Sequence, residues 1–242
     1  MSSPPCVPVM ARYAPAVDDG TIESTLVAAE RELAAAGAPD LRAVGFWRAV
    51  ASVKRRPAVV SRFGTRIAAI DRAAFTRHVR MRTDASVGAV VLALAAAVGL
   101  LLLGVAASLD HPLREIVLLI GAGALDGTTH GLAHFVVGSL LGIRFSDWFI
   151  APPKPPGFKV DYASYLAATA TRRAWMHASG AIVTKLVPFA IVPYALAIRC
   201  DTWSIAVLLA LGVVQLATDA LFSVRSSDWK KFRREMRATR PA

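Results

Sequence analysis

Long apolar segments dominate the chain from about residue 87 onward. Four of them, each with few charged residues, cover residues 87–108, 115–142, 174–198 and 203–224. A helix rises about 1.5 Å per residue, so each segment is long enough to cross roughly 30 Å of hydrocarbon. The pattern therefore predicts an all-α membrane protein with four transmembrane helices.

The region before the first apolar segment has a different pattern. Residues 1–20 are rich in Pro, Asp and small residues and predict a disordered tail. Residues 21–84 alternate helix-forming runs with Gly and Pro stops, which predicts helices over 21–37, 40–56 and 64–82. Asp40 is the expected N-cap of the second helix, and Pro57 lies beyond its end. We expect a cytoplasmic helical region that lies against the membrane surface.

Polar segments also separate and follow the apolar ones. Four prolines surround Lys154 in "APPKPPGFKVDY", and this composition forces extended backbone. We expect a Pro-rich flap or hairpin here, with a short strand in "GFKVDY". A transmembrane domain over 85–228 is followed by a basic cytoplasmic tail over 229–242.

Composition supports a membrane location. The chain is 55% hydrophobic, with a mean hydropathy of +0.48 and a formal net charge of +11. Lys and Arg gather before the first apolar segment, between the second and third, and after the fourth. By the positive-inside rule this distribution predicts a multi-pass protein of the cell membrane with both termini cytoplasmic. The lipid bilayer is then the main partner, and no motif indicates nucleic acid.

Ionisable side chains inside the apolar segments are the candidate functional residues, because such groups are costly in hydrocarbon. They are Asp126, His130, His134, His177, Lys185 and Asp219. His130 and His134 are one helical turn apart, so both rings project from one face and can bind one cation. Asp219 is the expected third ligand, since its helix brings it to a similar depth. Two imidazoles and a carboxylate suit Zn²⁺, and also Fe²⁺.

The same residues leave other interpretations open. The cluster is a hydrogen-bonded polar core without metal in one alternative, and in another His130 or His134 binds haem together with His177, as in a membrane electron carrier. Asp126 either orients His130 or bonds a neighbouring helix. Asp126 and His177 are also the candidate catalytic residues if a metal-bound water has to be deprotonated.

The order of these motifs resembles the site-2 protease family of intramembrane metalloproteases. "HGLAHFVVGSLLGIRF" is similar to the family's HExxH zinc helix, with His130 and His134 in the histidine positions. "SGAIVTK" loosely resembles the Gly-Pro-x-x-Asn element of the next span. "QLATDALFS" offers Asp219 where the family has an Asp-Gly pair. The resemblance covers about residues 114–228 and implies a zinc site, with membrane segments of other proteins as partners.

Gly131 is the largest departure from the family, because it replaces the glutamate that acts as general base in HExxH. The resemblance therefore implies a non-proteolytic, regulatory or binding protein. The alternative is an active zinc metalloprotease with another general base. Gly123, Gly127 and Gly131 recur every four residues, a spacing that also predicts close approach of another helix.

Overall fold

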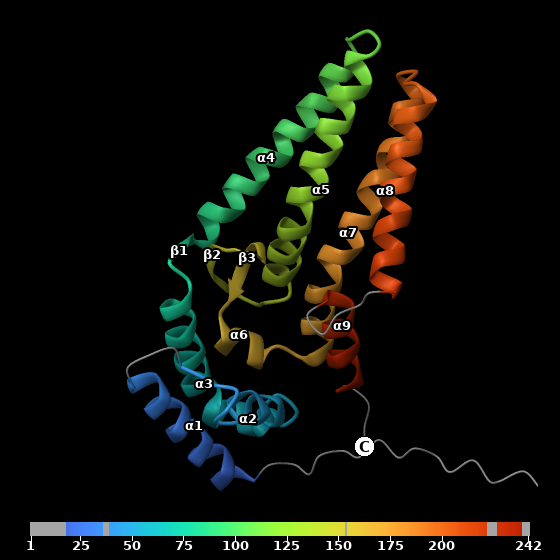
Figure 1. Ribbon diagram of the computed structural model, residues 1–242. Coiled ribbons are helices and arrows are strands. Elements are labelled where there is room, and N and C mark those ends of the chain that lie inside the picture. Colours follow the sequence, from blue (N-terminus) through green and yellow to red (C-terminus); the bar gives the residue numbers. More distant parts are fainter. Residues whose placement is uncertain (1–17, 36–38, 153, 222–226, 239–242) are drawn as a thin grey trace, which may run out of the picture.

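The structure is a computed structural model, and it describes residues 18–35, 39–152, 154–221 and 227–238. A tall column of long helices stands above a smaller group of helices, and a small sheet lies where the two meet (Figure 1). The described residues thus form a largely helical protein, as the sequence predicted.

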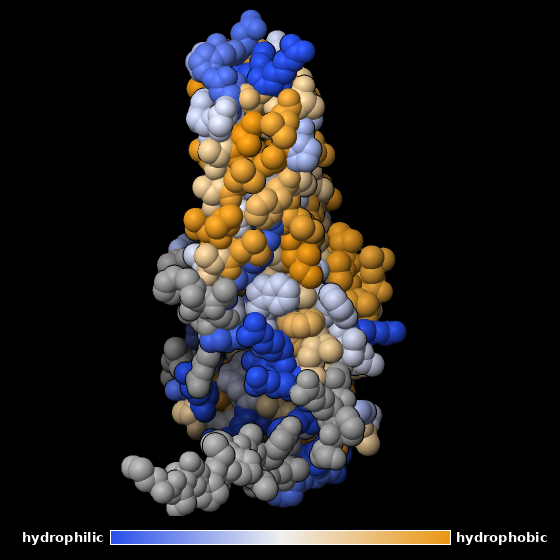
Figure 2. Space-filling view, turned by 90° about the vertical axis from the view of Figure 1, so that its right-hand side faces the viewer, coloured by the Kyte–Doolittle hydropathy of each residue, from blue (hydrophilic) through white to orange (hydrophobic). Residues whose placement is uncertain are grey.

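Four helices are long and apolar enough to cross a membrane, and they confirm the predicted spans. They are α4 (Ala85–Ala106), α5 (Leu113–Leu140), α7 (Ala170–Ala197) and α8 (Thr202–Leu221). Only 17% of the apolar window of α4 is buried inside the protein, although its mean hydropathy is 2.8. Apolar side chains cover the column between two hydrophilic ends (Figure 2). This is the architecture of a multi-pass membrane protein, whose outward apolar surface is suited to lipid.

Close contact between the long helices depends on glycines other than those predicted from the four-residue spacing. A Cβ at Gly121 would lie 2.8 Å from the carbonyl oxygen of Gly99, so α4 and α5 approach through these two residues. No atom of a neighbouring element lies within 4 Å of a Cβ built at Gly123 or Gly127. The expected packing role is therefore wrong for Gly123 and Gly127, because a spacing of four residues defines a face of a helix but does not place a neighbour on it.

Three helices precede the column: α1 (Asp19–Ala34), α2 (Phe46–Val53) and α3 (Pro57–His78). They share a buried core that includes Ile22, Leu26, Phe46, Phe63 and Ile67. The predicted second helix begins later than expected, because Asp40 accepts hydrogen bonds from the backbone of a preceding turn and Gly45, with φ of 78°, is the N-cap of α2. Pro57 is the first residue of α3, a position where its missing N–H costs nothing.

A three-stranded antiparallel sheet joins these helices to the column. It contains β1 (Met81–Asp84), β2 (Phe145–Ala151) and β3 (Lys154–Val160) in that order, so the predicted hairpin is confirmed and gains a third strand. Ion pairs of Arg72 with Asp147 and of Asp71 with Lys159 fasten α3 to the hairpin. The sheet is thereby held against both parts of the protein.

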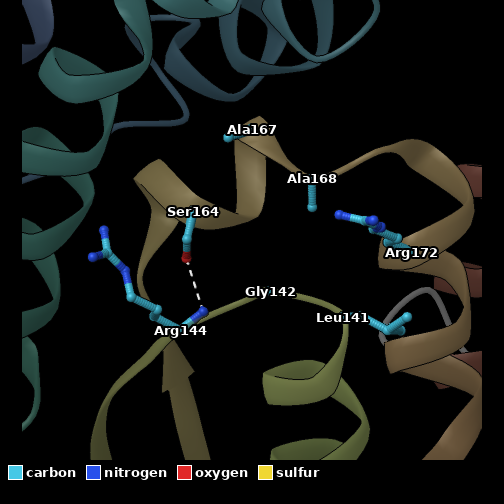
Figure 3. A pocket seen from close by; sticks show the side chains of 7 residues that line it. All are labelled: Leu141, Gly142, Arg144, Ser164, Ala167, Ala168 and Arg172. Carbon is cyan, nitrogen blue, oxygen red and sulfur yellow. Dashed lines mark hydrogen bonds between the residues drawn. The ribbon is translucent and has the colours of Figure 1, made fainter.

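The turn after α5 directs the chain into this sheet. Gly142 has φ of 82°, and the backbone N–H of Arg144 donates to Oγ of Ser164 over 2.9 Å. Ser164 belongs to the short helix α6 (Tyr162–Ala167), and a cavity of about 380 Å³ lies between this helix, the turn and the start of α7 (Figure 3). The turn and α6 together hold the lower ends of α5 and α7 in place.

The segment expected as a basic tail contains a further helix, α9 (Asp228–Arg237), which packs against the lower part of α7. Its N-cap is Ser227, whose side chain accepts a hydrogen bond from the backbone N–H of Lys230 over 3.3 Å. The predicted disordered tail falls mostly on residues 1–17, which lie outside the described residues.

Candidate metal centre

His130 and His134 project from one face of α5, as their spacing predicted. Their Nε2 atoms are 3.2 Å apart, and the two rings are nearly perpendicular, with an interplanar angle of 87°. The two ring nitrogens therefore point at a common position.

The outer nitrogens of both rings bond to α7. Nδ1 of His134 lies 2.7 Å from the carbonyl oxygen of Met176, which can only accept, so Nδ1 carries the proton. Nδ1 of His130 lies 2.9 Å from Oγ1 of Thr184, and that hydroxyl donates its own proton to the carbonyl oxygen of Gly180 over 2.8 Å. The hydroxyl oxygen is thus the acceptor for His130 as well. In the neutral form, both rings then present the lone pair of Nε2 to their common position.

A carboxylate completes this arrangement, and it belongs to Asp228 at the start of α9. Oδ2 of Asp228 is 3.2 Å from Nε2 of His130 and 3.1 Å from Nε2 of His134. Oδ1 is 2.9 Å from Nζ of Lys231. Burial would raise the pKa of Asp228, but hydrogen bonding to a further proton on Nε2 of His130 or His134 and the nearby charge of Lys231 hold the pKa well below its usual range. The carboxylate is therefore ionised.

We call His130, His134 and Asp228 the histidine–aspartate triad. Its three inward atoms form a nearly equilateral triangle with sides of 3.1 to 3.2 Å. When each ring is neutral and carries its proton on Nδ1, neither Nε2 has a hydrogen. Lone pairs of the two nitrogens and of Oδ2 then face one another. Such an arrangement can bind a cation, either a further proton on one imidazole or a metal ion.

The position of Asp228 depends on a buried charge network at the other end of α9. Glu235 is 2% exposed and forms ion pairs with Lys54 and with Nε of Arg173, the latter over 2.7 Å. Its Oε1 also accepts from the hydroxyl of Tyr165 over 3.3 Å. Burial would raise the pKa of Glu235, but Lys54 and Arg173 hold the pKa below its usual range. The network fastens α9 to α7, to α6 and to the N-terminal helices.

The triad opens onto a cavity of about 750 Å³. One side of the cavity is aromatic and comes from the hairpin, with Phe145, Phe149 and Phe158. Polar lining residues come from α7 and α8, and they include Thr184, Lys185, Gln215 and Asp219. The cavity thus offers an apolar wall and a polar wall to anything that lies beside the triad.

Asp219, the expected third ligand, lines this cavity but has another partner. Its carboxylate forms an ion pair with Lys185, whereas the carboxylate beside the two imidazoles is that of Asp228. Both acidic side chains are close to the cavity, but only Asp228 lies within hydrogen-bond distance of the histidines among the described residues. The structure therefore groups the two predicted histidines with a different aspartate.

The two candidate catalytic residues also have partners of their own. Both carboxylate oxygens of Asp126 accept from Nε2 of Gln215 on α8, over 3.0 and 2.9 Å. Asp126 thus bonds a neighbouring helix, the second of its two expected roles. Nε2 of His177 lies 2.9 Å from the hydroxyl of Tyr165, and His177 lines the same cavity as the triad.

Two glycines shape the site. A Cβ at Gly180 would lie within 2.8 Å of three ring atoms of His134, so only glycine leaves room for this ring. Gly131 faces the cavity, and a Cβ there would lie 3.0 Å from Leu92 and 3.6 Å from the ring of Phe158. A side chain at position 131 would therefore be oriented toward the cavity, with only limited space at its base.

Sequence reasoning missed Asp228, Thr184 and Glu235 as residues that form or support the site. In the sequence, "SSDWKKFRREMR" suggests at most a Ser N-cap followed by an acidic first turn, a common helix start that does not distinguish a ligand.

Comparison with known proteins adds no identity: no family model, no curated protein and no solved structure matches this chain.

Proposed function

We propose that this multi-pass membrane protein binds one divalent metal ion, Zn²⁺, through the histidine–aspartate triad. The single observation that carries the proposal is the convergence of Nε2 of His130, Nε2 of His134 and Oδ2 of Asp228 at 3.1 to 3.2 Å. A buried group of lone pairs without a hydrogen between them is costly unless a cation lies among them.

The size of the triangle supports zinc. Zn–N and Zn–O bonds of about 2.0 Å in tetrahedral geometry place neighbouring ligand atoms roughly 3.3 Å apart, close to the distances in the triad. The outer nitrogens are bonded to Met176 O and Thr184 Oγ1, which fix the ring orientation as partners of zinc-bound histidines generally do. Three protein ligands leave a fourth position for water or another ligand. The same donor set suits Fe²⁺.

We further propose that the chain uses a scaffold like that of the site-2 proteases without ordinary proteolysis. The motif order along α5 and α7 supports the resemblance, and the place of Gly180 beside His134 gives the loosely matching glycine a physical reason. The carboxylate of the triad differs from the expected one, since it comes from α9 and not from Asp219 on α8. Gly131 cannot accept a proton, and loss of a general base lowers a rate by roughly 10²–10⁴-fold. The protein then acts as a binding or regulatory protein for apolar segments that enter the cavity beside the hairpin.

The proposed orientation places α9, the N-terminal helices and the sheet on the cytoplasmic side of the cell membrane. The support is the excess of Lys and Arg in these parts of the sequence. The triad would then open to the cytoplasmic side, since Asp228 comes from a helix outside the spans.

Elemental analysis of the detergent-purified full chain tests the proposal directly. We expect zinc in the wild-type protein and one equivalent less per chain in His130→Ala and in His134→Ala. Asp219→Asn is the matched control, because Asp219 lines the same cavity and is paired with Lys185. Equal zinc in the wild type and both histidine variants would reject the triad as the site, and a strong Soret band would favour haem instead.

Hydrolysis is a second candidate function, favoured by one observation: His177 lines the triad cavity and so is a possible base. The test is cleavage of a model transmembrane substrate by the unaltered protein. Activity that disappears in His177→Ala, while zinc is retained, would establish the enzyme. Activity that appears only in Gly131→Glu would establish instead that the scaffold lacks just its base.

A further inference from the structure

A second cluster of possible ligands lies at the opposite end of the helical column from α9. It combines residues from the turn between α4 and α5, the first turn of α5, and the turn between α7 and α8. In Figure 1 these turns are at the top of the column, and in Figure 2 this end is hydrophilic above the apolar band. The cluster is therefore separated from the triad by the membrane-spanning part of the protein.

The cluster contains one imidazole and two carboxylates. Nδ1 of His111 lies 2.9 Å from Oδ2 of Asp201 and 3.4 Å from Oε2 of Glu115. These separations bracket the roughly 3.3 Å expected between ligands of a tetrahedral zinc ion. Two of the three separations are thus close to those of the triad, and one ligand atom of each residue lies within 4.8 Å of those of the other two.

Glu115 supplies an independent indication of a missing partner. Its side chain is fully buried, with 0% exposure, and Oε1 accepts from the backbone N–H of Asp201 over 3.2 Å. Oε2 is buried and has no hydrogen-bond partner among the described residues, and it faces Nδ1 of His111. A carboxylate oxygen left without a hydrogen bond in a buried position is costly. Helix starts favour acidic residues, but that preference does not require complete burial.

Protonation of His111 does not give Oε2 of Glu115 a hydrogen bond. The single hydrogen on Nδ1 bonds best to Oδ2 of Asp201, which is the closer oxygen at 2.9 Å, and Oε2 of Glu115 remains without a hydrogen bond. A cation at the position shared by the three atoms would satisfy both carboxylates and the imidazole together.

Hydrogen bonds hold the α4–α5 turn and the α7–α8 turn in fixed positions relative to each other. Arg114 donates from Nε to the carbonyl oxygen of Leu109 over 2.9 Å and from Nη1 to the carbonyl oxygen of Arg199 over 3.2 Å. Below the turns, the hydroxyl of Tyr194 donates to the carbonyl oxygen of Leu103 over 2.7 Å. The bonds of Arg114 to Arg199 and of Tyr194 to Leu103 cross between the α4–α5 pair and the α7–α8 pair, so the cluster does not need to assemble when a ligand arrives.

We propose that His111, Glu115 and Asp201 form a second divalent-cation site, on the side of the membrane opposite the triad. One nitrogen and two carboxylate oxygens suit Zn²⁺, Mn²⁺ or Fe²⁺. His111 and Asp201 have side chains 59% and 50% exposed, so the site is open to solvent and exchanges its ion with the medium on that side.

The test uses the full chain in detergent, equilibrated with Zn²⁺ at fixed free concentration and analysed for bound zinc. A variant with both His130→Ala and His134→Ala removes the triad and isolates the second site. We expect this variant to retain one equivalent of zinc per chain, and His111→Ala added to it to remove that equivalent. Glu115→Gln and Asp201→Asn, each added separately to the same variant, are expected to give the same loss.

Asp110→Asn is the matched control, since Asp110 is an exposed acid of the same turn outside the cluster. It should leave the equivalent in place. The inference is overturned if the variant without the triad histidines holds no zinc, or if its zinc is unchanged by all three cluster substitutions. A wild-type protein whose only zinc depends on His111 would reject the proposed function and support the second site, so the two failures are distinguishable.

Discussion

The end of α8 and the start of α9 present two carboxylates to the same cavity, and the two have different partners. Asp219 is paired with Lys185, and its side chain is 33% exposed. Asp228 is 15% exposed and uses one oxygen for Lys231 and the other for the two histidines. Each carboxylate thus has a lysine partner, but Oδ2 of Asp228 faces two imidazoles, which carry no positive charge in their neutral form. A carboxylate is therefore not a metal ligand merely because it lies beside the cavity. The better candidate is the carboxylate with an oxygen that has no positively charged partner.

The strongest test of this comparison removes each of the two carboxylates in turn. Asp228→Ala should remove the zinc bound at the triad, because it removes one of three ligands, whereas Asp219→Asn should leave zinc near the wild-type level. Bound zinc after dialysis against a weak chelator measures both. The reverse result, with zinc lost in Asp219→Asn and kept in Asp228→Ala, would assign the metal to α8, as the sequence alone suggested.

Releasing α9 should have the next largest effect. Glu235→Ala leaves Arg173 buried without its carboxylate, and breaking a buried ion pair in this way costs roughly 3–5 kcal/mol. We expect a lower melting temperature in detergent and reduced zinc content, because Asp228 and Glu235 lie on the same short helix. Lys230→Gln, on an exposed part of α9, is the control and should change neither quantity. Unchanged zinc with a lower melting temperature would show that Asp228 does not depend on this network.

The same network predicts a pH dependence. Lys54 and Arg173 hold the pKa of Glu235 below its usual range in the folded protein, so the contribution of Glu235 to stability is complete above the ordinary pKa of a glutamate. The contribution is lost as the pH falls through the lower, folded-state pKa. Melting temperatures at pH 7 and at about pH 4 should therefore differ more in the wild type than in Glu235→Gln. Equal differences in the two proteins would contradict this assignment.

Crowding the ring of His134 should weaken the site without removing a ligand. Gly180→Ala places a Cβ within 2.8 Å of three ring atoms, so the ring has to move away from the triangle. We expect zinc affinity to fall by roughly tenfold or more, as for other changes that reorient a ligand. Gly123→Ala is the control, because a Cβ there meets no neighbouring element. Similar affinities in the two variants would show that the position of the ring is not critical.

The smallest expected effect concerns Thr184, which accepts from Nδ1 of His130. Thr184→Val keeps the shape but removes the acceptor, and we expect zinc affinity to fall by roughly tenfold, the lower end of the range for loss of such a partner. Thr184→Ser keeps the hydroxyl and should bind zinc like the wild type. A competition titration against a zinc-binding dye separates the two. If valine and serine are equivalent at this position, the hydrogen bond does not orient His130.

The sequence alone predicted the long apolar helices, the hairpin and the histidine pair, for physical reasons that act locally. A run of apolar residues has to be as long as the bilayer is thick, and residues four apart share a helix face whatever surrounds them. The predicted packing role was wrong for Gly123 and Gly127, because a four-residue spacing does not say whether a neighbouring helix lies on that face.

Tertiary structure decided which carboxylate meets the histidines. Asp228 lies 94 residues from His134 along the chain, and α9 is held by an ion pair of Glu235 to Lys54, 181 residues away. No local pattern encodes such a pairing, since it depends on how α7, α9 and the N-terminal helices pack together. The sequence determined where the imidazoles lie within their helix, and packing between distant segments determined the charge that faces them.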